Sequence, residues 1–391
     1  MSITRRRFFG GVTGILGAIR FAPSLGAFGQ QPASTRPALM PAPSAADYDP
    51  LVKLAANENN YGPPDVVMKA MNDAWKYSNR YGYPDGGIMQ EIAKHHGVKQ
   101  ENILLAAGSG EILDVVGTTF LAGGKKVLGV EPTFSSVYDH ATSIKAEAIK
   151  LPLGKDFRQE IPAYIKAAHD HAGEIGLVYL CNPNNPTGII VTSAEVQQLL
   201  DGLPKGMPVL IDEAYHHFVE DPKYATSVPH VLAGRPVIVA RTFSKIAALA
   251  GMRLGYAIAS KENIDRMRPY SMGSINALVK HGGAASIRDQ AGQARMKKTI
   301  LDTRKKTTGE LQAYGYEVLP SEANFFMVSI GRQVQPVIEE FRKRNIMVGR
   351  PFPPMTEHLR VSVGTPDDMD KFLKAFKEIF PAKAKATTAV L

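Results

Sequence analysis

Four short segments of the sequence combine residue types that bind anions, form covalent bonds and move protons. Glycines and hydroxyls offer donors to an anion, whereas an acid, a tyrosine and a lysine offer proton chemistry. If they converge, they suit a phosphorylated cofactor. The segments are Gly108-Ser-Gly-Glu111, Asn182-Pro-Asn-Asn-Pro-Thr-Gly188, Asp212-Glu-Ala-Tyr215, and Thr242-Phe-Ser-Lys245 followed by Gly251-Met-Arg253.

Each segment also has a plain structural interpretation. A glycine-rich helix start can bind phosphate through backbone N–H groups, and it can equally be a tight turn. The proline-rich segment can be an ordinary loop, an aspartate at a strand end is often a helix cap, and a single lysine is usually a surface charge. The functional interpretation therefore depends on all four segments occurring together and in this order.

The elements that must position these segments follow from the hydrophobic pattern. Continuous apolar runs alternate with helical stretches such as Glu111–Phe120 and Ser193–Leu200, which is typical of a parallel sheet buried on both faces. Ligands of such sheets bind beyond the carboxyl ends of the strands, where the four segments lie. The predicted strands are Ile103–Ala106, Lys126–Val130, Leu177–Cys181, Val209–Ile211, Val237–Ala240 and Leu254–Ala259.

A second pattern follows in the C-terminal part of the sequence. Residues 261–311 are predicted to be one long helical region. Two short strands, Phe325–Val328 and Leu359–Val363, flank a helix at Val334–Lys343. This composition indicates a smaller α+β domain after the large one.

Together the segments resemble the pyridoxal-phosphate-dependent aminotransferases of fold type I, in particular their histidinol-phosphate aminotransferase-like branch. The resemblance extends roughly from Leu54 to Pro366 and implies an α/β fold: a large domain with a mostly parallel sheet and a smaller α+β domain. It is more specific for the cofactor, pyridoxal 5'-phosphate, than for the substrate. The motifs that carry it are Asn57-Glu-Asn-Asn-Tyr-Gly-Pro63, Tyr83-Pro-Asp85, Asn185-Pro-Thr-Gly188, Asp212-Glu-Ala-Tyr215, Ser244-Lys245 with Arg253, and Leu359-Arg-Val-Ser-Val-Gly364.

The resemblance implies a role for each residue around the cofactor ring. Lys245 would bond to the cofactor aldehyde and, once displaced by substrate, would move the proton; burial suits a lysine to both tasks. Asp212 would pair with the ring nitrogen and keep it protonated. Tyr215 and Asn185 would bond the ring's phenolic oxygen, and Phe134 would stack on the ring, where many relatives have tyrosine.

The resemblance also implies where the cofactor phosphate binds. The donors would be the backbone at Ser109 and Gly110, the hydroxyls of Thr242 and Ser244, and Arg253, whose planar fork fits phosphate oxygens.

Two further features concern assembly and variation. Tyr83 matches a tyrosine that relatives contribute from the partner subunit, which implies a homodimer with shared active sites. The sequence Gly108-Ser-Gly-Glu111 stands where relatives more often have Gly-Ser-Asp-Glu, so one acidic side chain is missing.

The substrate end of the site is less specific. Arg360 matches the arginine that holds the substrate's carboxylate or phosphate, and a bidentate arginine accepts either. Tyr61 and Arg350 match nearby pocket positions, although Arg350 can also belong to a surface ion pair. The stretch 269–276, Pro-Tyr-Ser-Met-Gly-Ser-Ile-Asn, departs from the usual Pro-Tyr-Asn-x-Asn and leaves the substrate open.

We therefore expect an aminotransferase that acts on an amino donor and a 2-oxo acid. A racemase, lyase or oxidase on the same scaffold is the nearest alternative, because all begin with proton loss at the same substrate carbon. A non-catalytic binding protein is the alternative from another class. Intact Lys245, Asp212 and Arg253 argue against it.

The net charge of +9 comes largely from the N-terminus. Residues 1–46 hold five arginines and no acid, which leaves 41 basic and 37 acidic residues, or +4, for the remainder. Basic clusters at 295–298 and 304–306 are predicted to be solvated helix faces, so no nucleic-acid partner is expected. No apolar run after the N-terminus is long enough to span a membrane, and no stable membrane partner is expected.

The N-terminus has the layout of an export signal. Thr4-Arg-Arg-Arg-Phe-Phe9 precedes an uncharged apolar run and small residues near Ala27–Gly29, which resembles a twin-arginine signal. We expect a periplasmic protein, with a cytoplasmic one as the alternative. The predicted parts are a signal peptide at 1–29, a linker at 30–46, an N-terminal segment packing with the small domain at 47–75, a large cofactor-binding domain at 76–285, a small domain at 286–381 and a tail at 382–391.

The remaining candidates have simple interpretations. Cys181 is the only cysteine, which excludes an intramolecular disulfide, and it is predicted to be a packed apolar residue. The adjacent His216 and His217 are expected to diverge rather than chelate, so no metal site is predicted. Trp75 is expected to pack in the core or at an interface.

Overall fold

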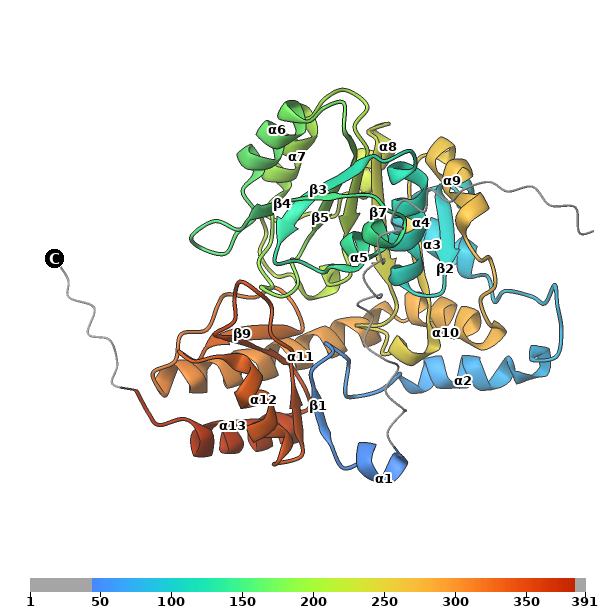
Figure 1. Ribbon diagram of the computed structural model, residues 1–391. Helices are drawn as coiled ribbons and strands as arrows, with labels where there is room; N and C mark the ends of the chain where they lie inside the picture. The colour runs from blue at the N-terminus through green and yellow to red at the C-terminus, as the bar shows by residue number, and fades with distance from the viewer. Residues whose placement is uncertain (1–43, 384–391) are drawn as a thin grey trace, which may run out of the picture. The chain divides into compact units, whose positions relative to one another are not determined.

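The computed structural model describes residues 44–383 (Figure 1). The described residues divide into two units, of which the first ends at Tyr48 and contains helix α1 (Ala45–Tyr48) and the second begins at Asp49. The predicted signal peptide, residues 30–43 of the linker and residues 384–391 of the tail lie outside the described residues.

A seven-stranded sheet with the order β2-β8-β7-β6-β5-β3-β4 forms the centre of the large domain. Every pair is parallel except those of β8, which runs antiparallel to β2 and β7. All six predicted strands are present. The strands are β2 (Ile103–Ala106), β3 (Lys126–Glu131), β4 (Ala148–Pro152), β5 (Ile175–Cys181), β6 (Val209–Asp212), β7 (Val237–Thr242) and β8 (Gly255–Ile258).

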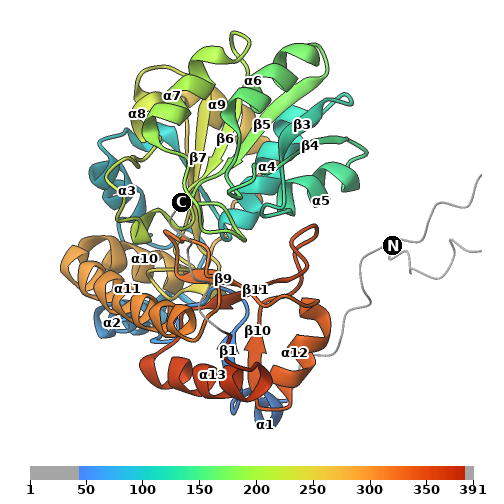
Figure 2. The ribbon, with the colours of Figure 1, turned by 90° about the vertical axis from the view of Figure 1, so that its left-hand side faces the viewer.

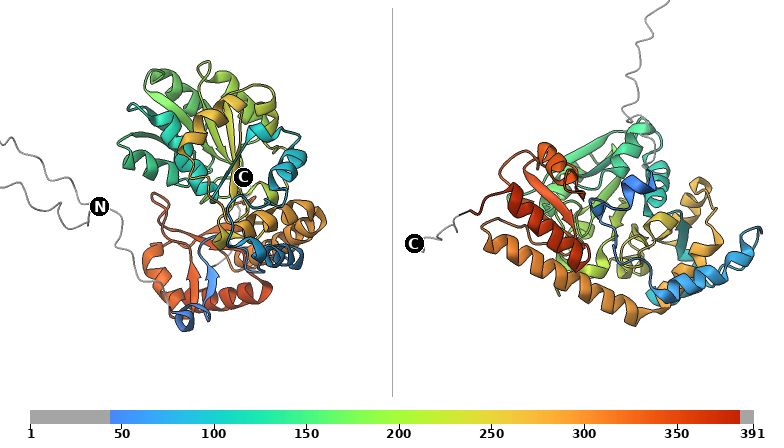
Figure 3. Two further views of the ribbon diagram at one scale, coloured as in Figure 1. Left: turned by 90° about the vertical axis from the view of Figure 1, so that its right-hand side faces the viewer. Right: turned by 90° about the horizontal axis from the view of Figure 1, so that it is seen from below.

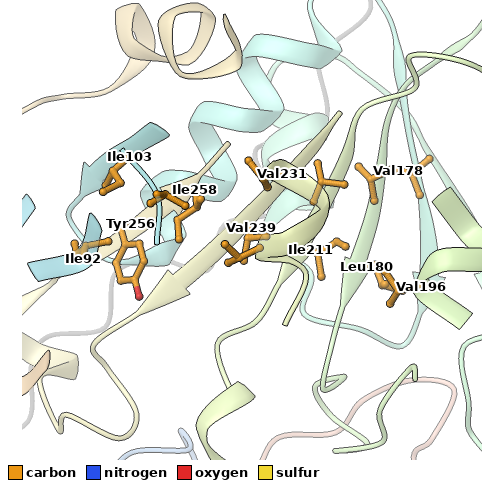
Figure 4. Packing of buried hydrophobic residues seen from close by; sticks show 14 of the residues in the cluster. Ile92, Ile103, Val178, Leu180, Val196, Ile211, Val231, Val239, Tyr256 and Ile258 are labelled. Atoms are coloured by element: carbon orange, nitrogen blue, oxygen red, sulfur yellow. The ribbon is translucent and has the colours of Figure 1, made fainter. Parts of the chain in front are cut away.

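The sheet is buried on both faces because its central strands carry apolar residues at almost every position. Figure 4 shows this packing on one face, where Val178, Ile211 and Val239 from adjacent strands lie side by side. One face packs against α4 (Ser109–Leu121), α5 (Ser136–Ser143) and α9 (Lys261–Met267). The other packs against α3 (Ile88–His96), α6 (Ile161–Asp170), α7 (Ser193–Gly202), α8 (Val228–Leu232) and α10 (Ala277–Arg288), with α2 (Asp65–Asp73) beside α10.

The smaller α+β domain contains two short sheets (Figure 2). Strands β1 (Val52–Leu54) and β10 (Ile346–Val348) pair in parallel, and β9 (Phe325–Ser329) pairs with β11 (His358–Ser362) antiparallel. Helices α11 (Gln290–Ala313), α12 (Val334–Arg342) and α13 (Pro366–Ile379) share an aromatic-rich core with these strands. Figure 3 shows α11 and α13 close together in the view from below.

The prediction of one helical region over 261–311 is wrong in its continuity. A short 3₁₀ helix and an extended segment separate α9 from α10, and there Pro269 and the left-handed Gly273 (φ 69°) interrupt the helical backbone, whereas Asp289 alone separates α10 from α11. The 3₁₀ helices are η1 (Trp75–Tyr77), η2 (Gln100–Asn102), η3 (His216–Phe218), η4 (Ala250–Met252) and η5 (Arg268–Tyr270).

The N-terminal segment crosses from the small domain to the sheet. Strand β1 pairs with β10, and the chain then passes through Ala55–Asn57. These residues line a cavity together with the last residues of β6 and β7. The predicted boundaries at residues 76, 286 and 382 stay predictions.

A fully buried ion pair joins the ends of β6 and β7. Arg241 is 2% exposed and Glu213 0%, and their side chains lie 2.6 Å apart. The Glu213 carboxylate also accepts hydrogen bonds from the Ser227 N–H at 2.6 Å and the Thr226 hydroxyl at 2.9 Å, and the Arg241 guanidinium contacts His216. Because both charges are inside the protein, each depends on the other for compensation.

Replacing Glu213 with alanine is expected to lower the free energy of unfolding by about 3–5 kcal/mol, because the variant leaves the Arg241 charge buried and uncompensated. Urea denaturation monitored by circular dichroism measures the loss. Glu378→Ala is the control, since it breaks a half-exposed pair with Arg344 at 2.9 Å and should cost at most about 1 kcal/mol. Equal losses in the two variants would contradict the expectation.

Candidate active site

The candidate site lies at the carboxyl ends of β5, β6 and β7, as the parallel topology requires. Asp212 is the last residue of β6 and Thr242 the last of β7, while Asn185 lies in the loop that follows β5. A cavity of about 650 Å³ opens there. The predicted residues that line it are Ser109, Gly110, Phe134, Asn185, Asp212, Tyr215, Thr242, Ser244, Lys245, Arg253, Arg350 and Arg360.

Two of the predicted residues lie elsewhere. Tyr61 packs against the apolar core of the smaller domain. Tyr83 lines a separate cavity of about 660 Å³ and donates a hydrogen bond to the Ile275 carbonyl. Neither tyrosine is among the residues that line the 650 Å³ cavity of its own chain.

Lys245 reaches into the middle of the cavity from the loop after β7. Its Nζ donates to the Ala56 carbonyl at 3.2 Å and lies 5.6 Å from the centre of the Tyr215 ring. Burial, reinforced by the positive charge of Arg360, lowers the pKa of Lys245 to about 8. Roughly a tenth of the amine is therefore neutral at pH 7, far more than at the ordinary lysine pKa of 10.5, and the neutral form is the one that can act as nucleophile or base.

Asp212 lies close enough to Lys245 for the two charges to interact, and it has few partners of its own. Among the described residues, the carboxyl accepts a hydrogen bond from the Ala214 N–H at 3.1 Å. Burial raises the pKa of Asp212 to about 6, although the Ala214 hydrogen bond and the Lys245 charge both act against the rise. A buried carboxyl of this kind is stabilised by one more N–H donor, and the protonated ring nitrogen of pyridoxal phosphate would supply it.

Arg360 and Asn185 are held together across 175 residues of sequence. The Arg360 Nη1 donates to the Asn185 side-chain oxygen at 2.6 Å, and its Nη2 donates to the Ala55 carbonyl. The bond turns the Asn185 amide so that its own N–H₂ group stays available as a donor. The Arg360 Nε is buried without a partner among the described residues, which leaves one donor for a ligand.

The phosphate end of the cavity is built around the start of α4. Gly108 has a φ of 88°, and a Cβ atom there would lie 2.3 Å from the Arg253 Nη2, so only glycine lets the guanidinium lie against this turn. The hydroxyl of Thr242 donates to that of Ser244 at 2.8 Å. Helix N–H groups, hydroxyls and an arginine in one cradle fit a phosphate.

Two residues with a structural link to the site were not assigned a role from sequence. Asn57 has a left-handed φ of 54° and donates to the Tyr215 hydroxyl at 3.0 Å, while the Ser362 hydroxyl donates to Asn57 at 3.1 Å. Glu111 accepts the N–H groups of Ala107 at 2.6 Å and Met272 at 2.9 Å, which ties the start of α4 to the divergent stretch 269–276. The sequence signal that could have identified Asn57 is its place in the motif Asn57–Pro63.

The histidines next to the site correct one expectation. The rings of His216 and His217 do not diverge, because their centres lie 3.6 Å apart. Burial and then the charge of Arg241 lower the pKa of both far below the ordinary value. The same two causes lower the pKa of His96 to about 2.

These histidines are expected to make the protein unstable in acid. Their pKa values are lower in the folded than in the unfolded chain, so stability is present above about pH 6.5 and is lost as pH falls, by about 1.4 kcal/mol per pH unit for each proton. Asp212 acts in the opposite direction, because its pKa is raised to about 6 in the folded chain. Below that pH the folded protein binds one proton more at Asp212 than the unfolded chain does, which offsets the effect of one histidine. Urea titrations from pH 8 to 5 measure the slope. His217→Gln should reduce the slope by one proton relative to the wild type, and a slope equal to that of the wild type would contradict the expectation.

Two further findings concern residues 44–383. No group of three or more His, Cys, Asp or Glu side chains is arranged to hold a metal ion. No helix in this range is both long and apolar enough to cross a membrane.

Comparison with known proteins supports the same kind of site. The family Aminotransferase class I and II matches residues 49–376. A histidinol-phosphate aminotransferase from Moorella thermoacetica is 34% identical over 84% of this chain and 85% of its own length.

Solved structures share the fold. One from Erwinia carotovora atroseptica is 28% identical, with a TM-score of 0.81, and covers 85% of this chain and 96% of that chain. The histidinol-phosphate aminotransferase of Sinorhizobium meliloti, solved with pyridoxal-5'-phosphate, is 23% identical, with a TM-score of 0.76 over 84% of this chain and 90% of that chain.

The fold and the cavity define a pyridoxal-phosphate-dependent enzyme of fold type I. The chain belongs to the class I and II aminotransferases. It transfers an amino group between an amino donor and a 2-oxo acid, with pyridoxal 5'-phosphate as cofactor.

Proposed function

We propose that this cavity is the active site, and that its amino donor is histidinol phosphate or another substrate with an acidic group. The observation that carries the proposal is one cavity that contains an amine with lowered pKa, a buried carboxyl and a buried guanidinium with an unpartnered Nε. Relatives named histidinol-phosphate aminotransferase, 31–34% identical, support the amino-phosphate.

Pyridoxal phosphate, when bound, supplies an aldehyde for the amino group and a ring that withdraws electrons from the substrate carbon. Lys245 Nζ accepts the proton from that carbon and would pass it to the cofactor, and it would carry a proton in the opposite direction when the 2-oxo acid is aminated; a pKa of about 8 suits it to both transfers. With the cofactor bound, Asp212 would hold the ring N–H, and Tyr215 and Asn185 would donate to the phenolic oxygen. Arg253, with the start of α4, holds the phosphate.

Arg360 orients the substrate by its acidic group. Its Nη1 and Nη2 are held by the protein, so the guanidinium is fixed before the substrate arrives. Because the guanidinium is fixed in advance, less entropy is lost when the substrate anion binds in a reactive geometry.

The test is the absorption spectrum of the purified protein with added histidinol phosphate and with a panel of acidic, aromatic and aliphatic amino acids. We expect loss of the visible cofactor band and release of the matching oxo product, and the fastest amino donor identifies the substrate. Oxygen uptake, racemisation or elimination without the spectral change would instead indicate an oxidase, racemase or lyase. A spectrum that no donor changes would overturn the proposal.

We propose further that the enzyme is a homodimer to which Tyr83 contributes in trans. Trp75 (59% exposed) and Tyr81 (105%), in the segment that leads to Tyr83, and Met272 (74%), beside the same cavity, present an apolar surface to solvent. A second copy would cover that surface. Light scattering gives the mass.

Mixed dimers test the contribution of Tyr83. In a dimer of Lys245→Ala and Tyr83→Ala chains, one site contains an intact lysine and an intact tyrosine only if the tyrosine acts in trans. Recovery of activity on mixing the two purified variants is the expected result. Absence of recovery, with mixed dimers detected, would place Tyr83 in its own chain's site.

We propose, finally, periplasmic localisation through the twin-arginine motif at residues 4–9. This route carries folded proteins, so the cofactor can be loaded before export. Arg5→Lys combined with Arg6→Lys is expected to leave the precursor in the cytosol. Unchanged fractionation would contradict the proposal.

A further inference from the structure

The ring of Phe352 contacts both arginines at the substrate end of the cavity. The guanidinium carbon of Arg350 lies 4.4 Å from the ring centre and that of Arg360 lies 4.6 Å from it. All three side chains line the cavity. Phe352 is 4% exposed, so its ring is a fixed part of the wall rather than a mobile surface group.

The chain holds this ring from two sides. Phe352 packs in a small apolar cluster with Leu319, Met327 and Met355, and its carbonyl accepts the Met355 N–H at 2.7 Å. Gly349, which precedes the segment, lies against Arg360, because a Cβ atom there would be 2.7 Å from the Arg360 carbonyl. The position of the ring is therefore set by packing that does not depend on a bound substrate.

The two arginines need such a partner because they lack a carboxylate. Among residues 44–383, neither Arg350 nor Arg360 forms an ion pair with an acidic side chain, and the pKa of Arg360 is lowered, first by burial and further by the positive charge of Arg350. The face of an aromatic ring carries partial negative charge and attracts guanidinium groups. It can hold two cations at the wall without neutralising them, which a carboxylate cannot do.

We propose that Phe352 is a positioning residue that holds the guanidinium groups of Arg350 and Arg360 at the cavity wall, where they receive the anionic group of the substrate. The inference rests on the proposed function for the identity of the substrate. The arrangement of Phe352 and the two guanidinium groups itself requires only that the bound group is an anion. An aliphatic residue of similar size would fill the same volume and would lose the attraction for both cations.

The variants Phe352→Leu and Phe352→Tyr separate packing from aromatic character. The first measurement is a calorimetric titration of the cofactor-loaded protein with inorganic phosphate. The cofactor is loaded beforehand so that its own phosphate fills the cradle near α4 and the added phosphate binds at the arginines. We expect Phe352→Leu to weaken phosphate binding about 5- to 30-fold, with Phe352→Tyr within about 2-fold of the wild type. In Phe352→Leu the KM of the amino donor should rise in parallel with the weaker phosphate binding, while kcat and the absorption spectrum change little.

Phe157→Leu is the matched control. Phe157 packs against the same small cluster, and its ring stacks edge-on with His358 rather than with an arginine. Wild-type phosphate affinity in Phe352→Leu would overturn the inference, as would equal losses in Phe352→Leu and Phe157→Leu. The phosphate measurement needs no turnover, so an enzyme without aminotransferase activity would still report on Phe352.

Discussion

Lys245→Ala is expected to reduce kcat/KM by at least about 10⁴-fold, the largest effect of any substitution at the site. In the proposed mechanism one Nζ atom both bonds the cofactor and moves the proton, so the variant loses both functions at once. No described lysine other than Lys245 lines the cavity, so no neighbouring amine can replace it.

The matched variant is Lys245→Arg, which keeps the positive charge near Asp212. Arginine stays protonated at any physiological pH, so it cannot serve as nucleophile or base. We expect it to be as inactive as Lys245→Ala. Exogenous methylamine should restore part of the activity to the alanine variant and none to the arginine variant, because only the former leaves room for the added amine.

The wild-type pH profile gives an independent check. Because the pKa of Lys245 in the free protein is lowered to about 8, cofactor binding to the apoprotein should accelerate as pH rises through that value. Fluorescence quenching on mixing with pyridoxal phosphate measures the rate. A rate that is independent of pH between 6 and 9 would contradict the assignment of the nucleophile.

The sequence predicted the centre of the sheet well because the information there is local. Strand β2, for example, was predicted with its observed bounds, since an apolar run ends directly before the Gly108 turn. Asp212 and Lys245 were placed together because parallel strands bring their carboxyl ends to one edge. In the centre of the sheet, the local sequence therefore determined both where each strand lies and at which end of the strand its functional side chain lies.

Three features could not be predicted for a physical reason. The direction of β8 is antiparallel, but a continuous apolar strand has the same pattern in either direction. Strand β4 at the sheet edge is half-exposed and carries Lys150, so its hydrophobic signal is weak. The break between α9 and α10 depends on Pro269 and Gly273, whose effect the helical composition on both sides concealed.

The substrate end of the site depends on contacts across long sequence separations. The bond between Arg360 and Asn185 and the contacts of Phe352 with two arginines join segments that no local pattern relates. A family motif can identify Arg360 as an anion binder, but the packing that orients it becomes visible only in three dimensions.

Arg360→Gln is expected to show how much that orientation matters. The substitution removes a guanidinium that is 6% exposed and bonded to Asn185 and Ala55, and truncating a buried charged partner of this kind typically costs 2–5 kcal/mol of binding. We therefore expect kcat/KM for the amino donor to fall by about 30- to 5,000-fold. Steady-state kinetics with donor and acceptor varied separately measure the loss.

Arg350→Gln provides the contrast, because Arg350 is exposed at the cavity rim and pays less desolvation on binding. Its kcat/KM should fall less than about 10-fold, and the loss should shrink at high salt, since rim charges are screened. Arg360→Lys should remain close to Arg360→Gln, because the compact ammonium of lysine lacks the planar fork that reaches Asn185 and Ala55 while presenting a further N–H to the substrate. If Arg360→Lys regained most of the activity, charge alone would explain substrate binding, and the fixed fork of Arg360 would have no part in it.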